Sequence, residues 1–121
     1  MCTRFQTLGL LAALLLTVVG VADAETVAET LETPEFGQLT IERTTDEPKG
    51  IVLFASGPGG WNADLTTVAR EIADQNYVVA GIDLNAWLAR LDRSEAACID
   101  LSAEFDRLNR LLEGRYPPAT H

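Results

Sequence analysis

Basic side chains are scarce in this sequence, which has 9 lysine and arginine residues against 18 aspartate and glutamate residues and a formal net charge of −9. Proteins bind nucleic acids and anionic lipid surfaces through clusters of lysine and arginine. The composition therefore argues against a nucleic-acid-binding protein and against tight binding to an anionic membrane. A cationic substrate and a basic protein partner are both compatible with it.

Only one long apolar run is present, from Leu8 to Val21, and it carries no charge. Arg4 precedes this run, and the small residues of the segment ADA at 22–24 follow it. This arrangement is typical of a secretory signal peptide, whereas a membrane-spanning helix needs about 20 apolar residues. The sequence predicts a signal peptide at residues 1–24, cleaved before Glu25, and export of the rest of the chain.

Cysteine and histidine are almost absent, because the chain has 2 cysteines and 1 histidine. Cleavage of the signal peptide removes Cys2, so Cys98 has no disulfide partner within the chain and is expected to be a small buried residue. A closed zinc site needs about four such ligands, and no metal or other cofactor is predicted. His121 is the last residue, where an imidazole is a poor general base because nothing holds it close to a nucleophile.

The exported part divides into an acidic linker at residues 25–35 and a domain at residues 36–121. Within the domain, short apolar runs alternate with segments whose apolar residues recur at helical spacing. Apolar strands that alternate with helices predict an α/β fold with a parallel sheet and crossover connections. The expected elements are about three strands, at residues 36–43, 51–55 and 78–82, and two or three helices, at residues 62–76, 85–91 and 94–114.

The glycine-rich segment after the second expected strand is the most informative part of the sequence. Residues 51–61 read IVLFASGPGGW, and a helical pattern begins directly after them. The strand is apolar on both faces, as a central parallel strand is. A strand, a glycine turn and a helix together expose backbone N–H groups at the carboxyl end of the strand and at the helix N-terminus. This segment is therefore a candidate ligand site.

Four interpretations of the glycine-rich segment are open. A dinucleotide-binding loop would account for the spacing of Gly57 and Gly59 and for an acid, Asp83, at the end of the next strand, but the third glycine is missing. A phosphate-binding P-loop needs lysine and then serine or threonine after Gly60, and neither is present. An oxyanion loop of an α/β-hydrolase needs exposed backbone N–H groups. A tight turn that packs Trp61 into the core needs no ligand.

The same residues resemble a known family. The segments FASGPGGW at residues 54–61 and VAGID at residues 79–83, with Cys98 before a helix rich in leucine, resemble the amino-terminal portion of the AcvB/VirJ virulence-protein family. The resemblance spans about residues 50–118. It implies a partial α/β-hydrolase-like fold, a periplasmic location and, for complete members, hydrolysis of lysyl-phosphatidylglycerol. The oxyanion-loop candidates are then Ser56, Gly57, Gly59, Gly60 and Trp61, and Asp83 is a further candidate.

The chain departs from that family where catalysis would occur. Pro58 stands where the family has an acidic residue, and the nucleophile motif G-x-S-x-G is absent from the sequence. No catalytic residue is assigned, and a lipid headgroup is an expected substrate only for a complete family domain. We therefore expect a truncated domain that is inactive alone. Two further interpretations are a periplasmic module that binds a protein partner through an exposed sheet edge, and a remnant of a broken gene.

Overall fold

The computed structural model describes residue 20, residues 24–95 and residues 98–119. The predicted signal peptide lies almost wholly outside the described residues, and so does His121. Within the described ranges, no helix is both long enough and apolar enough to cross a lipid bilayer. In chain order the elements are β1 (Thr26–Thr33), β2 (Gly37–Thr44), β3 (Ile51–Ala55), α1 (Ala63–Ala73), β4 (Val78–Ile82), α2 (Leu84–Asp92) and α3 (Leu101–Arg115).

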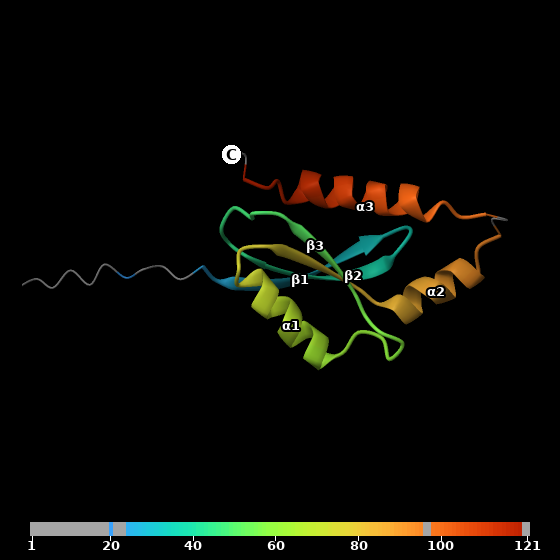
Figure 1. Ribbon diagram of the computed structural model, residues 1–121, viewed down its shortest axis with the longest axis horizontal. Helices are drawn as coiled ribbons and strands as arrows, with labels where there is room; N and C mark the ends of the chain where they lie inside the picture. The colour runs from blue at the N-terminus through green and yellow to red at the C-terminus, as the bar shows by residue number, and fades with distance from the viewer. Residues whose placement is uncertain (1–19, 21–23, 96–97, 120–121) are drawn as a thin grey trace, which may run out of the picture.

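The strands form one mixed sheet of 4 strands in the order β1-β2-β4-β3 (Figure 1). β2 runs antiparallel to both β1 and β4, and only β3 and β4 are parallel. The predicted parallel, α/β-hydrolase-like sheet of three strands is therefore wrong. Parallel neighbours need a long crossover connection, and α1 supplies one between β3 and β4. The prediction assumed that β2 is also parallel to its neighbours, whereas β2 runs antiparallel to β4.

β1 occupies part of the segment predicted as an acidic linker. It pairs with β2 along its whole length, from Thr26 opposite Thr44 to Thr33 opposite Gly37. The connecting turn is tight, because Gly37 has a φ of +71° and the Thr33 hydroxyl oxygen accepts the Phe36 N–H at 3.1 Å. Every second side chain of β1 is less exposed than its neighbours. This alternation is the signal for a strand, and the acidic, threonine-rich composition conceals it.

Helices cover the two faces of the sheet, with α3 on one side and α1 on the other (Figure 1). Alternate residues of β4 point to the two faces. Ala80 and Ile82 enter the larger apolar cluster, which includes Leu108 and Leu112 of α3. Val79 enters a smaller cluster with alanines of α1. All residues of β4 are buried, whereas the first four of β3 are partly buried and Ala55 is exposed. The strand expected at the centre of the sheet therefore lies at its edge.

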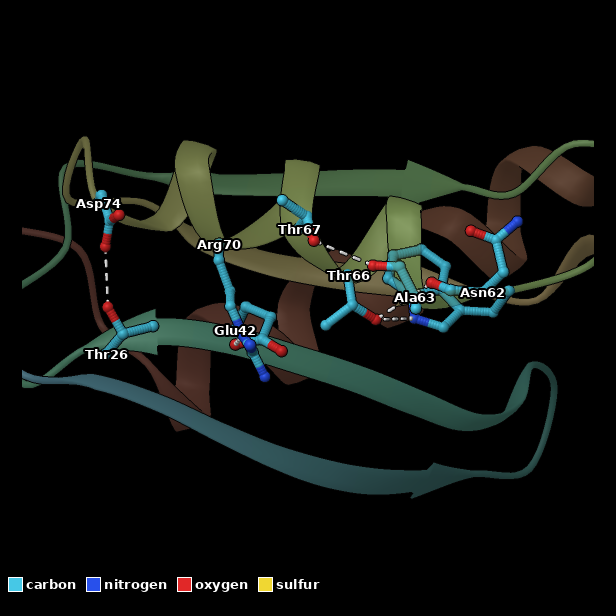
Figure 2. Close-up of polar contacts among 9 residues, drawn as sticks. Thr26, Glu42, Asn62, Ala63, Thr66, Thr67, Arg70 and Asp74 are labelled. Atoms are coloured by element: carbon cyan, nitrogen blue, oxygen red, sulfur yellow. Dashed lines mark hydrogen bonds and ion pairs between the residues drawn. The ribbon is translucent and has the colours of Figure 1, made fainter.

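α1 begins where the sequence predicts and is held over the antiparallel part of the sheet (Figure 2). Asn62 is its N-cap, and the side-chain oxygen accepts a backbone N–H of the first turn at 3.0 Å. Nε of Arg70 lies 3.4 Å from the carboxylate of buried Glu42 on β2. The Thr26 hydroxyl of β1 donates to Asp74, directly after the helix, at 2.8 Å. These polar contacts place one side of α1 against β2.

α3 begins later than predicted. The sequence predicts a helix from residue 94, with Ser94 as its cap, whereas the N-cap in the structure is Asp100, whose carboxylate accepts the Ala103 N–H at 3.1 Å. Cys98 therefore lies before the helix and is exposed, which corrects the expectation of a buried thiol. Serine and aspartate are both favoured N-cap residues, so residue type alone does not fix where this helix begins.

Candidate functional site

The glycine-rich loop connects the carboxyl end of β3 to the start of α1. The Gly60 N–H donates to the Gly57 carbonyl at 3.1 Å, which closes a tight turn. Gly60 has a φ of +75°, a conformation that glycine adopts without the strain a side chain would bring. Gly57 and Gly59 border open space. Only Gly60 is therefore required by the turn itself.

Ser56, the first residue of the loop, joins it to the corner between β4 and α2. Its N–H donates to the Ile82 carbonyl at 2.9 Å, and its hydroxyl oxygen accepts the Leu84 N–H at 2.8 Å. The side chain is buried. A buried hydroxyl that accepts a backbone N–H stabilises the corner, because that N–H would otherwise lack a partner.

Asp83 holds both the loop and the start of α2. One carboxylate oxygen accepts the Ala86 N–H at 3.0 Å as the N-cap of α2, and the other accepts the Trp61 N–H at 3.3 Å. These backbone donors, Ala86 first, lower the pKa of Asp83 below its ordinary 3.8, although burial opposes them. The Asn85 amide adds a hydrogen bond of 2.6 Å to the Pro58 carbonyl. The carboxylate of Asp83 is thus engaged by the chain's own backbone.

Trp61 fills the space between the loop and the sheet. Its ring lies so close to Gly81 of β4 that a Cβ at that position would overlap it. The Phe54 ring meets it edge-on, with centroids 5.5 Å apart, and the indole N–H donates to the Thr66 hydroxyl at 3.0 Å. This geometry favours the interpretation of a tight turn, with Trp61 partly buried and packed against the smaller apolar cluster.

The loop retains little binding capacity for an anion. The N–H groups of Gly60 and Trp61, both expected as oxyanion donors, bond within the chain. Those of Gly57 and Gly59 are the loop donors without a partner among the described residues. The described ranges also contain no group of three or more side chains suited to hold a metal ion. The loop therefore offers two backbone donors and an already occupied Asp83.

A cleft of about 370 Å³ lies at the other end of β4, where that strand begins. It is lined by residues 43–48, Val78 and residues 115–117. These segments are far apart in the sequence and contain no recognisable motif, so sequence reasoning missed the cleft. Only their tertiary packing brings them together.

Tyr116 is the central side chain of this cleft. Its hydroxyl donates to the Glu29 carboxylate in a short hydrogen bond, and the guanidinium groups of Arg43 and Arg115 lie 5.5 and 5.8 Å from its ring centroid. The Tyr116 hydroxyl, more than Arg43, lowers the pKa of Glu29 below its ordinary value, although burial opposes this. Burial, followed by Glu29, raises the pKa of Tyr116. Because Glu29 and the acids at residues 46–47 balance the guanidinium groups, the cleft has no excess of positive charge.

The outer side of β3 carries backbone groups that have no partner among the described residues. Two residues that flank β3 bond to β4. The Gly50 carbonyl accepts the Val78 N–H, and the Ser56 N–H donates to the Ile82 carbonyl. Backbone groups of successive strand residues point to opposite sides. Ile51, Leu53 and Ala55 therefore direct their N–H and C=O groups to the free edge, where no strand of the described chain pairs with them.

No family model, curated protein or solved structure matches this chain. The resemblance to the AcvB/VirJ family, and the periplasmic location and hydrolase activity that it implies, therefore stay predictions from the sequence.

Proposed function

We propose that this protein is a non-catalytic interaction module that takes an extended polypeptide segment onto the free edge of β3, in the periplasm if the predicted export occurs. The proposal depends on one observation, the row of outward backbone groups at Ile51, Leu53 and Ala55. A segment that adds to such an edge gains main-chain hydrogen bonds, and its side chains provide specificity.

β3 lacks the features that keep edge strands from pairing. Edge strands are protected by charged side chains, proline or bulges, and the sequence IVLFA of β3 has no charge and no proline. Its first four side chains are partly exposed and the fifth, Ala55, is exposed. Pairing at this edge would remove apolar surface from water as well as satisfy backbone groups.

The helical layers define what kind of segment fits. Ile51 and Leu53 pack toward the larger cluster beneath α3, whereas Val52 and Phe54 pack toward the smaller cluster beneath α1. A strand added beside β3 would extend both layers, and strands covered on both faces are apolar throughout. We therefore expect a segment about as long as β3, which has 5 residues, with apolar side chains on both faces.

Catalysis at the glycine-rich loop is less well supported than strand addition at β3. An acyl-transfer site needs a nucleophile next to a base, together with donors directed at the developing oxyanion. Ser56 is buried against a backbone N–H, and Asp83 accepts two further backbone N–H groups. Ester turnover by the purified chain that is lost on Ser56→Ala would overturn the non-catalytic part of the proposal.

A labelled peptide tests whether the edge accepts a strand. The probe is IVLFA flanked by lysines for solubility, and its binding is followed by fluorescence anisotropy. The Ala55→Pro variant removes an outward N–H without removing a bond to β4, whereas the matched Ala55→Ser variant keeps that N–H. We expect Ala55→Pro to weaken binding about tenfold and Ala55→Ser to leave it unchanged. Equal binding to both variants, or no binding up to about 1 mM peptide, would refute strand addition at this edge.

A further inference from the structure

We infer that the strand accepted by β3 is β3 of a second copy of this chain, so that two molecules form one continuous sheet about a two-fold axis. This inference rests on the proposed function, because it names the partner of the same edge. The result would be a sheet with the 4 strands of each copy joined at β3.

The backbone of β3 is self-complementary in an antiparallel arrangement centred on Leu53. In this register Leu53 lies opposite Leu53 of the second copy, and Ile51 lies opposite its Ala55. These are the residues whose N–H and C=O groups point outward. Residues opposite one another in a hydrogen-bonded antiparallel pair exchange both of their bonds. Every outward donor therefore meets an outward acceptor.

The side chains of β3 are complementary in the same register. A two-fold axis perpendicular to the sheet keeps like faces together, so Val52 lies opposite Phe54 of the second copy on the α1 side. This is a non-hydrogen-bonded pair, in which the side chains are closest. Pairs of a β-branched and an aromatic residue stabilise neighbouring strands. On the α3 side, the two Leu53 side chains meet.

α1 adds an apolar rim above this junction. Arg70 is bonded to Glu42 of β2, which fixes the side of the helix that faces away from β3. Val68 precedes Arg70 by two residues, or about 200° of rotation around the helix, and so lies on the opposite side. Its side chain is 41% exposed. Val68 therefore adds exposed apolar surface on the side of α1 that lies toward β3.

Electrostatics favours a second copy over a basic partner at this edge. Residues 50–60 contain no charged side chain, so the chain's excess of acid is not presented here. Lys49, the nearest charge before β3, would face the uncharged glycine-rich loop of the second copy. β1 carries Glu29 and Glu32, which would meet like charges if two β1 edges paired. Self-pairing is thus opposed at β1 and unopposed at β3.

Cysteine cross-linking tests the register directly. In a background with Cys2→Ser and Cys98→Ser, Leu53→Cys is compared with Val52→Cys. Two Leu53 Cα atoms in a hydrogen-bonded pair would be about 5.5 Å apart, within the range of a disulfide, whereas each Val52 faces Phe54. We expect mild oxidation to produce at least about tenfold more covalent dimer from Leu53→Cys. Equal yields from the two variants, or no cross-linked dimer from either, would overturn the inference.

Sedimentation equilibrium of the purified chain tests association without a covalent bond. We expect a dimer whose Kd rises about tenfold in Ala55→Pro and stays unchanged in Ala55→Ser. A dimer unaffected by Ala55→Pro would place the contact elsewhere and overturn the inference. Thermal melts show whether both variants fold. If Ala55→Pro does not fold, the cross-linking comparison of Leu53→Cys with Val52→Cys decides whether β3 pairs with β3. A wild-type monomer that binds the IVLFA peptide would overturn only the second copy as partner, and a monomer that binds no peptide would overturn the proposed function as well.

Discussion

The two edges of the sheet differ in charge, length and origin. β1 has 8 residues, includes Glu29 and Glu32, and belongs to a hairpin with β2. β3 has 5 uncharged apolar residues and enters the sheet through a crossover. Charged side chains on an edge discourage pairing with other strands. The comparison indicates that an edge is available for partners when it is uncharged and lies between two helical layers.

The two edges are also anchored by different kinds of contact. On the β3 side, Trp61 packs on Gly81 and against Phe54. On the β1 side, Tyr116 bonds to Glu29. Apolar packing does not depend on pH, whereas a contact with a carboxylate does. Substitutions should therefore separate the apolar packing of Trp61 at the β3 side from the titratable contact between Tyr116 and Glu29 at the β1 side.

The largest effect is expected for Gly81→Ala, which places a methyl group against the Trp61 ring. We expect the free energy of unfolding, measured with urea, to fall by about 3 kcal/mol. The matched control is Gly114→Ala in α3, where a Cβ meets open space and helix propensity favours alanine. Equal stability of these two variants would contradict close packing of Trp61 on β4.

Ser56→Ala should have the next largest effect, because it removes the buried acceptor of the Leu84 N–H. Leaving that donor without a partner is expected to lower the free energy of unfolding by about 2 kcal/mol. Ser102→Ala, at an exposed position of α3, should change it by less than about 0.5 kcal/mol. The same urea titrations measure both, and a loss no greater than that of Ser102→Ala would show that Ser56 does not stabilise the corner.

Tyr116→Phe should cost about 1 kcal/mol near neutral pH by removing the hydroxyl that donates to Glu29. Because the pKa of Glu29 is lowered in the folded state, its contribution is present above the unfolded pKa and is lost as pH falls through the folded pKa. The difference in stability between wild type and Tyr116→Phe should therefore narrow as the pH falls below 4.5, the ordinary pKa of a glutamate. Thermal melts between neutral pH and about pH 3 measure this, with Tyr77→Phe as control. A difference independent of pH would argue against the Glu29 contact.

Glu32→Val, at an exposed position of β1, should have the smallest effect on stability. We expect the free energy of unfolding to change by less than about 0.5 kcal/mol. This change should instead increase association, because it removes a charge that protects the β1 edge. Light scattering should detect species larger than a dimer. Glu71→Val removes the same charge from an exposed position of α1 and should not produce them. Similar association of both variants would attribute the effect to net charge alone.

Local patterns in the sequence predicted much of the secondary structure and some of the site. The strands at 51–55 and 78–82 are confirmed, and Asn62 is the N-cap that its position indicates. The glycine-rich loop was located, but the bond between the Trp61 N–H and the Asp83 carboxylate joins residues 22 apart in the chain. The sequence contains no local signal for such a bond, so the occupied state of the loop could not be predicted.

The sequence by itself determined most of the strands and helices, though not β1 or the start of α3, because apolar spacing, glycine turns and cap residues act within a few neighbouring positions. Only the tertiary structure decided that β4 inserts between β2 and β3 and that β3 lies at the edge. The apolar run of β3 is equally compatible with a central strand, since both positions between helical layers bury side chains on two faces. Which position it takes depends on long-range pairing of β4 with β2, and no residue within β3 encodes that contact.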